Sequence, residues 1–211
     1  MDLSGIHRVI RGFVSKIDGV LQPPYGDAAW AKKLAELVLF GTAGLRFHHQ
    51  VEDEEFWPVL VAKGVDPAVL EPLTVAHRAL DPLLDQLEAE AVRLRSAPAD
   101  SSIVASLAAI LPRFRDHVRD HLDEEEPIIF PLLEAHVSNA QAHAIAGRAA
   151  KKAPKRGISW LIGGVVNAMT PAEAQNFLRP FPKPILWISP LLLRTYRRNC
   201  AALGLSPDFP R

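Results

Sequence analysis

Two segments of the chain carry a histidine and a glutamate four residues apart on a stretch typical of an α-helix. They are HHQVEDEEFWP, with His48 and Glu52, and HLDEEEPIIFP, with His121 and Glu125. Residues four apart lie above one another on a helix face, so each segment directs an imidazole and a carboxylate toward one point. Two such helices facing each other would offer nitrogen and oxygen ligands to a pair of hard or borderline metal ions.

The elements that must position these side chains are indicated by apolar residues that recur every three or four positions. This pattern predicts amphipathic helices over residues 2–21, 28–62, 67–96 and 101–136. Prolines, a glycine and aspartates that can cap helix starts separate the four segments. Because long helices joined by short connections pack as antiparallel neighbours, we predict an all-α, up-down-up-down four-helix bundle over residues 1–137.

Each of the four predicted helices places a histidine near the middle of its apolar face. A lone histidine on such a face is more often an ordinary core residue than a ligand. Burying this whole set without a metal ion would leave charges and polar groups uncompensated, at about 1–3 kcal/mol for each unpaired polar group. We therefore interpret the set as metal ligands: His7, His48, Glu52, His77, His121 and Glu125.

Polar residues beside the two motifs are expected outside the metal site. His49 adjoins His48 but points about 100° away around the helix, so a peripheral position is expected. The acidic residues that follow each motif glutamate, including Asp53 and Glu126, are expected on the solvated face.

Composition excludes several classes of protein. The 211 residues have a formal net charge of zero and 48% hydrophobic residues, which is ordinary for a globular protein. The single cysteine, Cys200, excludes an internal disulfide, and the first residues lack a signal-peptide pattern, so a cytoplasmic location is expected. No apolar run reaches the roughly 18 residues of a transmembrane helix. Aromatic residues are not interleaved with basic ones, so no nucleic-acid partner is expected.

The last third of the chain, residues 138–211, differs in charge from the rest. It holds 11 of the 24 Lys and Arg residues but only 2 of the 24 Asp and Glu residues. We predict that it forms a basic, apolar helical extension that packs on the acidic bundle. A peripheral membrane contact or a dimer contact through residues 158–198 is the alternative use of its apolar segments.

The ligand set and the motif segments resemble the hemerythrin-like, or HHE cation-binding, domain family over residues 1–137. This resemblance implies a cofactor of two non-heme iron ions joined by an oxo or hydroxo bridge. Carried over to this chain, it implies that Glu52 and Glu125 bridge the ions. His7 and His48 would then serve one iron, and His77 and His121 the other.

The chain departs from the oxygen-carrying members of the family at one ligand. Those proteins have a further histidine on the third helix, where this sequence has Leu73. His117, one turn before His121, is a possible additional ligand. It could complete one iron, orient a ligand, or be a buried polar residue.

Two classes of function follow from the resemblance. The first is a di-iron protein that binds and reacts with oxygen, peroxide or nitric oxide. If it is an enzyme, it would be an oxidoreductase of the peroxidase, catalase or nitric-oxide-consuming type. The alternative is a non-catalytic module that senses oxygen or nitric oxide, or that stores and delivers iron, including for repair of iron–sulfur centres.

Overall fold

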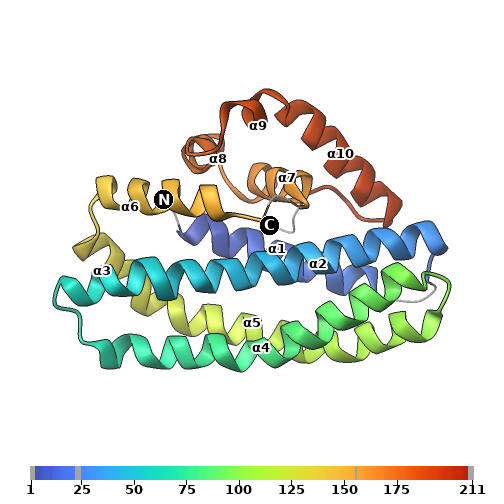
Figure 1. Cartoon of the computed structure of the whole chain (residues 1–211), viewed down its shortest axis with the longest axis horizontal. Helices are drawn as coiled ribbons and strands as arrows, with labels where there is room; N and C mark the ends of the chain where they lie inside the picture. Colours follow the sequence, from blue (N-terminus) through green and yellow to red (C-terminus); the bar gives the residue numbers. More distant parts are fainter. Residues whose placement is uncertain (1–2, 22–24, 155, 209–211) are drawn as a thin grey trace.

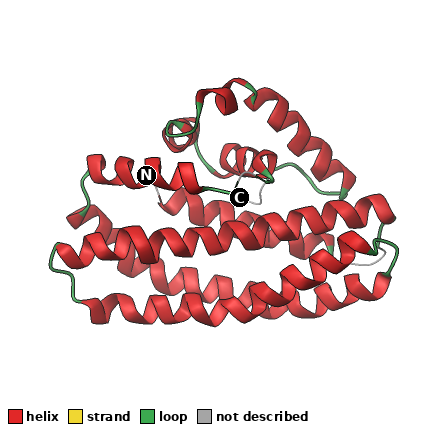
Figure 2. Ribbon diagram, viewed as in Figure 1, coloured by secondary structure: helices red, strands yellow, loops and turns green. Residues whose placement is uncertain are grey.

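The computed structural model describes residues 3–21, 25–154 and 156–208, and every regular element among them is helical. Long helical rods lie side by side with alternating direction, and shorter helices cover one side of them (Figures 1 and 2). The prediction of an all-α bundle with additional C-terminal helices is confirmed.

The rods begin and end close to the predicted boundaries. They are α1 (Leu3–Val20), α2 (Ala28–Val51), α4 (Pro67–Ser96) and α5 (Ser101–His136), and α2 continues through a π-helical turn, η1 (Glu52–Phe56), into α3 (Trp57–Ala62). Residue 2, the predicted start of the first helix, lies outside the described residues. Asp27, Asp66 and Asp100 each accept a hydrogen bond from a backbone N–H of the helix that follows, which satisfies donors that a helix start leaves unpaired.

The bundle has two apolar clusters, one at each side of a polar layer. The larger cluster takes Leu80 to Leu94 from α4 and residues as far as Leu122 from α5. The smaller cluster takes Leu70 and Leu73 from α4 and Ile129 from α5. The motif residues of these helices therefore lie in the gap between the two clusters, inside the bundle.

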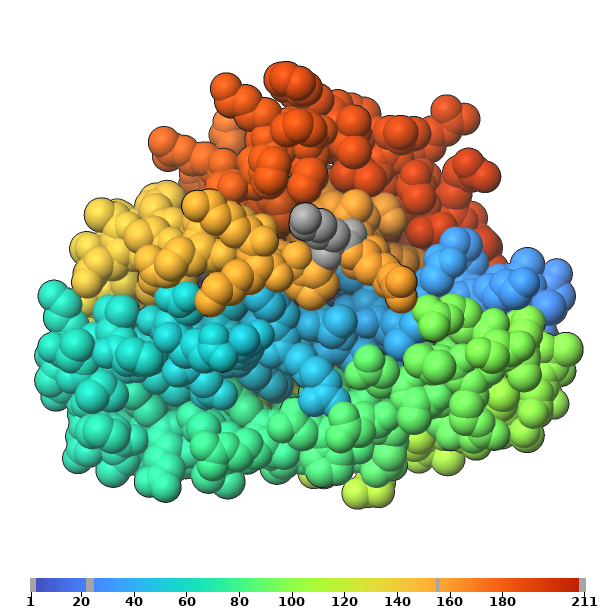
Figure 3. All heavy atoms as spheres, in the orientation of Figure 1, coloured from blue at the N-terminus to red at the C-terminus, as the bar shows by residue number. Residues whose placement is uncertain are grey.

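Shorter helices make up the described C-terminal part (residues 139–154 and 156–208), which lies over α1 and α2 (Figures 1 and 3). Their bounds are α6 (Asn139–Lys152), α7 (Ile158–Ala168), α8 (Pro171–Leu178), α9 (Lys183–Trp187) and α10 (Ser189–Ala202). The Gly163-Gly164 pair allows α7 to lie directly against its neighbours. A Cβ on Gly163 would come within 2.1 Å of Tyr196 on α10, and one on Gly164 within 2.7 Å of Phe13 on α1.

Charged contacts tie this part to the acidic bundle. Arg148 and Lys152 on α6 pair with Glu55 of the π-helical turn, at 2.7 and 3.5 Å. Arg8 on α1 pairs with Glu173 on α8 at 2.9 Å. Within the described residues, no helix combines the length and the apolar character needed to cross a membrane.

Candidate metal centre

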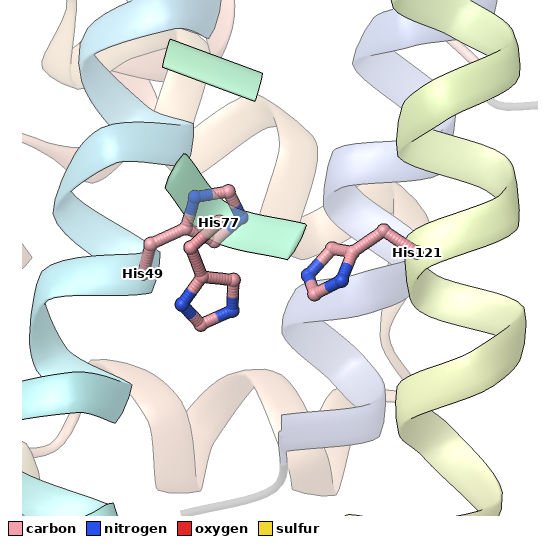
Figure 4. Close-up of side chains that lie close together, drawn as sticks. All are labelled: His49, His77 and His121. Carbon is pink, nitrogen blue, oxygen red and sulfur yellow. The ribbon is translucent and has the colours of Figure 1, made fainter. Parts of the chain in front are cut away.

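Two groups of potential metal ligands meet inside the bundle. The first, called site A, consists of His7, His48, Glu52 and Glu125. The second, called site B, consists of His49, His77 and His121, whose rings converge from three helices (Figure 4). In each site the ligand atoms lie within 4.8 Å of one another, and every one of these residues is buried. The structure thus brings together all six ligands predicted from the sequence and adds His49.

The two carboxylates lie between the sites. Oε1 of Glu52 is 3.3 Å from Nε2 of His48, while its Oε2 is 3.6 Å from Nε2 of His77. Oε1 of Glu125 is 4.0 Å from Nε2 of His7, while its Oε2 is 3.1 Å from Nε2 of His121. Each glutamate therefore turns one oxygen toward site A and the other toward site B.

The helix that carries Glu52 changes its geometry at this residue. The turn from Glu52 to Phe56 is π-helical, so the backbone N–H of Trp57 donates to the carbonyl of Glu52, five residues earlier. Single π-helical turns inside α-helices are frequent at functional sites. Here the turn comes just before Pro58, whose ring would crowd the carbonyl four residues earlier in a regular α-helix.

The atoms that point into the centre are buried and have no hydrogen-bond partner among the described residues. They are Nε2 of the five histidines and both carboxylate oxygens of Glu52 and Glu125. An unpaired buried polar group costs about 1–3 kcal/mol, and a buried charge costs more. Imidazole nitrogens and carboxylate oxygens are ligands that iron and related cations accept. The residues therefore fit a pair of metal ions.

Two further carboxylates form hydrogen bonds with histidines of the centre, at the ring nitrogen that faces away from it. Nδ1 of His77 is 3.1 Å from Oδ1 of Asp53, which also accepts a hydrogen bond from Thr74. Nδ1 of His7 is 3.0 Å from Oε1 of Glu126. An ionised carboxylate can only accept, so Nδ1 donates and Nε2 keeps a free lone pair directed at the centre.

Asp53 and Glu126 are half-buried and reach inward to these histidines, rather than lying only on the solvated face as expected. Each follows a motif glutamate in the sequence, and each orients the histidine of a helix that lacks the motif. The signal available in the sequence was that an acidic residue directly follows each motif glutamate. Sequence alone did not reveal which histidine each acid would meet.

Burial and neighbouring charges set the protonation of the metal-free centre. Burial lowers the pKa of His7, and lowers the pKa values of His48 and His49 much further, so these rings are neutral and able to ligate. Burial, followed by the nearby Glu125, raises the pKa of Glu52 well above its usual value. Burial also acts to raise the pKa of Glu125, but His121 and His7 outweigh it and the net shift is downward.

The structure does not bring His117 to the centre. Its side chain is exposed and its Nδ1 lies 2.8 Å from the carbonyl of Arg113 on the same helix. At about 100° per residue, His117 lies about 40° to one side of His121, whereas Val118, Glu125 and Ile129 lie 40–80° to the other side. The buried arc of α5 is therefore centred away from His117, and the expectation that it faces inward was wrong.

The peripheral position expected for His49 was also wrong. The residue is 5% exposed, and its ring stacks on that of His77, with centroids 4.1 Å apart and planes 5° apart. The buried arc of α2 is centred between His48 and His49, so the rotation of about 100° directs them to different sites. Val38, three turns earlier and on the side of His49, is an apolar residue that could have indicated this arc.

Comparison with known proteins agrees with this centre. The family model described as the hemerythrin HHE cation-binding domain matches residues 2–133, and this range includes every residue of sites A and B. Searches among curated proteins and among solved structures found no match. Since the family model covers well over half of the chain, the protein belongs to the family of hemerythrin HHE cation-binding domains.

Proposed function

We propose that the chain holds a pair of non-heme iron ions inside the bundle, one in each site. The histidines of site A would ligate one ion and those of site B the other, with Glu52 and Glu125 as bridging ligands. The orientation of the two carboxylates supports bridging, because each has one oxygen toward each site. The observation that carries the proposal is the set of buried, unpartnered nitrogen and oxygen atoms at the centre.

We propose further that a small oxidant or diatomic molecule (oxygen, peroxide or nitric oxide) binds and reacts at site A. Site A has two imidazoles and site B has three, so an ion in site A keeps more coordination positions open. Iron with imidazole and carboxylate ligands supplies redox chemistry when it is bound. The protein contributes neutral imidazoles, fixed ring orientations and a buried setting that limits access of water.

Metal analysis of a paired set of variants tests the iron proposal. The double variant Glu52→Gln/Glu125→Gln keeps side-chain volume but removes both bridging carboxylates. Its matched control, Glu54→Gln/Glu124→Gln, changes two exposed glutamates at neighbouring positions of the same motifs. We expect the first variant to lose one or both irons and the control to keep both. Retention of both irons by the first variant would contradict the ligand assignment.

An optical spectrum of the iron-loaded protein tests reactivity. We expect near-ultraviolet charge-transfer bands that change when peroxide or nitric oxide is added. Bands that recover as the added molecule is consumed indicate turnover. A stable adduct without consumption would contradict the reactive function and favour a binding module.

A further inference from the structure

A large cavity lies between the bundle and the C-terminal helices and reaches the metal centre. Its volume is about 530 Å³, within the range of roughly 300–1,000 Å³ typical of small-molecule sites. Residues of α1 and α2 form one wall, and residues of α6, α7 and α8 form the other. Figure 1 shows the C-terminal helices lying over α1 and α2. The ring of His48, a member of site A, forms part of this wall.

The body of the cavity is lined by apolar side chains. Aromatic and aliphatic residues come from the bundle and from α7 and α8, whereas α6 presents small residues, including Ala146 and Ala150. On α2, Gly44 also lines the cavity, and a Cβ built on it would meet no atom within 4 Å. Small residues on both faces therefore keep open a volume that larger residues would fill. Well-packed protein interiors rarely leave such space unless a ligand uses it.

The depth of the cavity is set by residues from the far side of the bundle. Leu87 of α4 and Phe114 of α5 line it, together with His48. A molecule that enters between the C-terminal helices and the bundle can therefore extend into the bundle interior. This depth leaves room for the chain of an apolar molecule.

The polar lining residues are mostly exposed and lie at the rim. Asn139, His143, Asn176 and Arg179 are exposed, while Glu173 is already paired with Arg8. Arg179 forms no ion pair with any residue of the described ranges, so its charge is available to a ligand. An unpaired guanidinium at the rim of an apolar cavity complements a carboxylate.

We propose that this cavity binds an alkyl carboxylate, with its hydrocarbon chain inside and its carboxylate at Arg179. The inner end of the chain lies against His48, beside site A. Binding depends on the cavity alone. Only an effect of the bound chain on the iron centre rests on the proposed function.

Calorimetric titration of the full chain with decanoate, laurate, myristate and palmitate tests the proposal. We expect the Kd to fall about fourfold for each buried methylene until the alkyl chain fills the cavity. The variant Arg179→Gln should weaken laurate binding several-fold and leave binding of the corresponding alcohol unchanged. Equal affinity for all chain lengths, or no binding of any of them, overturns the proposal.

Matched glycine variants locate the site. We expect Gly44→Leu, which places a side chain in the cavity, to weaken laurate binding at least tenfold. Gly147→Leu on α6 is the control, because a Cβ there also meets no atom within 4 Å but the residue does not line the cavity. Ala150→Leu fills the cavity from the opposite wall and repeats the test if Gly44→Leu is poorly folded. Unchanged binding in both filled variants overturns the proposal.

Two further measurements separate this inference from the iron proposal. Laurate should bind the metal-free protein as well, so this binding persists even if iron binding fails. In the iron-loaded protein, laurate should shift the optical bands of the wild type and not those of Gly44→Leu. Cosedimentation with anionic phospholipid vesicles, without binding of free laurate, would assign the surface to a membrane and overturn the proposal.

Discussion

Replacing His49 with leucine should stabilise the metal-free protein and reduce the further stabilisation that iron provides. In the metal-free protein the Nε2 atom of His49 is buried and has no hydrogen-bond partner. Leucine is apolar and similar in size, so it can fill the space beside His77 without leaving a polar atom unpaired. The cost removed is about 1–3 kcal/mol, so metal-free His49→Leu should be more stable than the metal-free wild type by this amount.

Iron should stabilise the variant less than it stabilises the wild type. Loss of a residue that only supports a ligand reduces metal affinity about 10–100-fold, so loss of the ligand itself should cost at least about 100-fold, or roughly 2.7 kcal/mol. The stabilisation by iron is set by this affinity, so it falls by about 2.7 kcal/mol, whereas the gain of the metal-free fold is present in both forms. For a chain of this size, that is roughly 5–11 °C in the difference between loaded and metal-free Tm.

Thermal unfolding followed by circular dichroism, with iron content measured on the same samples, provides the assay. His117→Leu is the control, because His117 is exposed and outside both sites, and its effect should stay within about 0.5 kcal/mol. If metal-free His49→Leu is less stable than wild type while its stabilisation by iron is unchanged, His49 does not ligate iron. That result would make His49 a packing residue only.

Three other predictions follow from contacts around the centre and in the C-terminal part. Glu126→Gln removes the carboxylate that pairs with Nδ1 of His7 and should weaken iron binding about 10–100-fold. Asp123→Asn should not, because the carboxylate of Asp123 meets Arg11 but no histidine; equal iron affinity of the two variants in a competition titration would contradict this. The metal-free protein should lose stability as pH falls below about 6.5, because burial lowers the pKa of histidines in both sites and the unfolded chain then binds protons that the folded chain does not. Each histidine that is protonated only in the unfolded chain adds about 1.4 kcal/mol per pH unit to the slope, and Glu52, whose raised pKa keeps it protonated only in the folded chain, subtracts the same amount. A flat urea-unfolding profile between pH 7 and 5.5 would refute this prediction. Gly163→Ala should destabilise the fold by about 1–3 kcal/mol, because its Cβ would overlap the ring of Tyr196; a variant as stable as wild type in urea unfolding would contradict the close packing of α7 on α10.

The helices and most of the centre were predictable from the sequence because both depend on local periodicity. Apolar spacing located the four rods to within a few residues, and the repeated motif identified Glu52 and Glu125. The helical repeat alone is enough to predict which residues share one face of a helix. Six of the seven residues in sites A and B were found in this way.

The remaining features depend on how the helices are rotated against each other. His49 on α2 and His117 on α5 each lie near an edge of the face inferred for their own helix. A rotation of either helix by a few tens of degrees decides whether its histidine is buried. The contacts of Asp53 and Glu126 require two side chains from different helices to meet. The cavity depends on how far α6 stands from α2. None of these relations is encoded in the spacing of one helix.

Anomalous X-ray scattering at the iron absorption edge, from crystals of the iron-loaded protein, tests the central claim most directly. We expect two peaks inside the bundle. One should lie among the ring nitrogens of His7 and His48, the other among those of site B, and the carboxylates of Glu52 and Glu125 should lie between them. A single peak, or peaks away from these side chains, would contradict a paired iron centre.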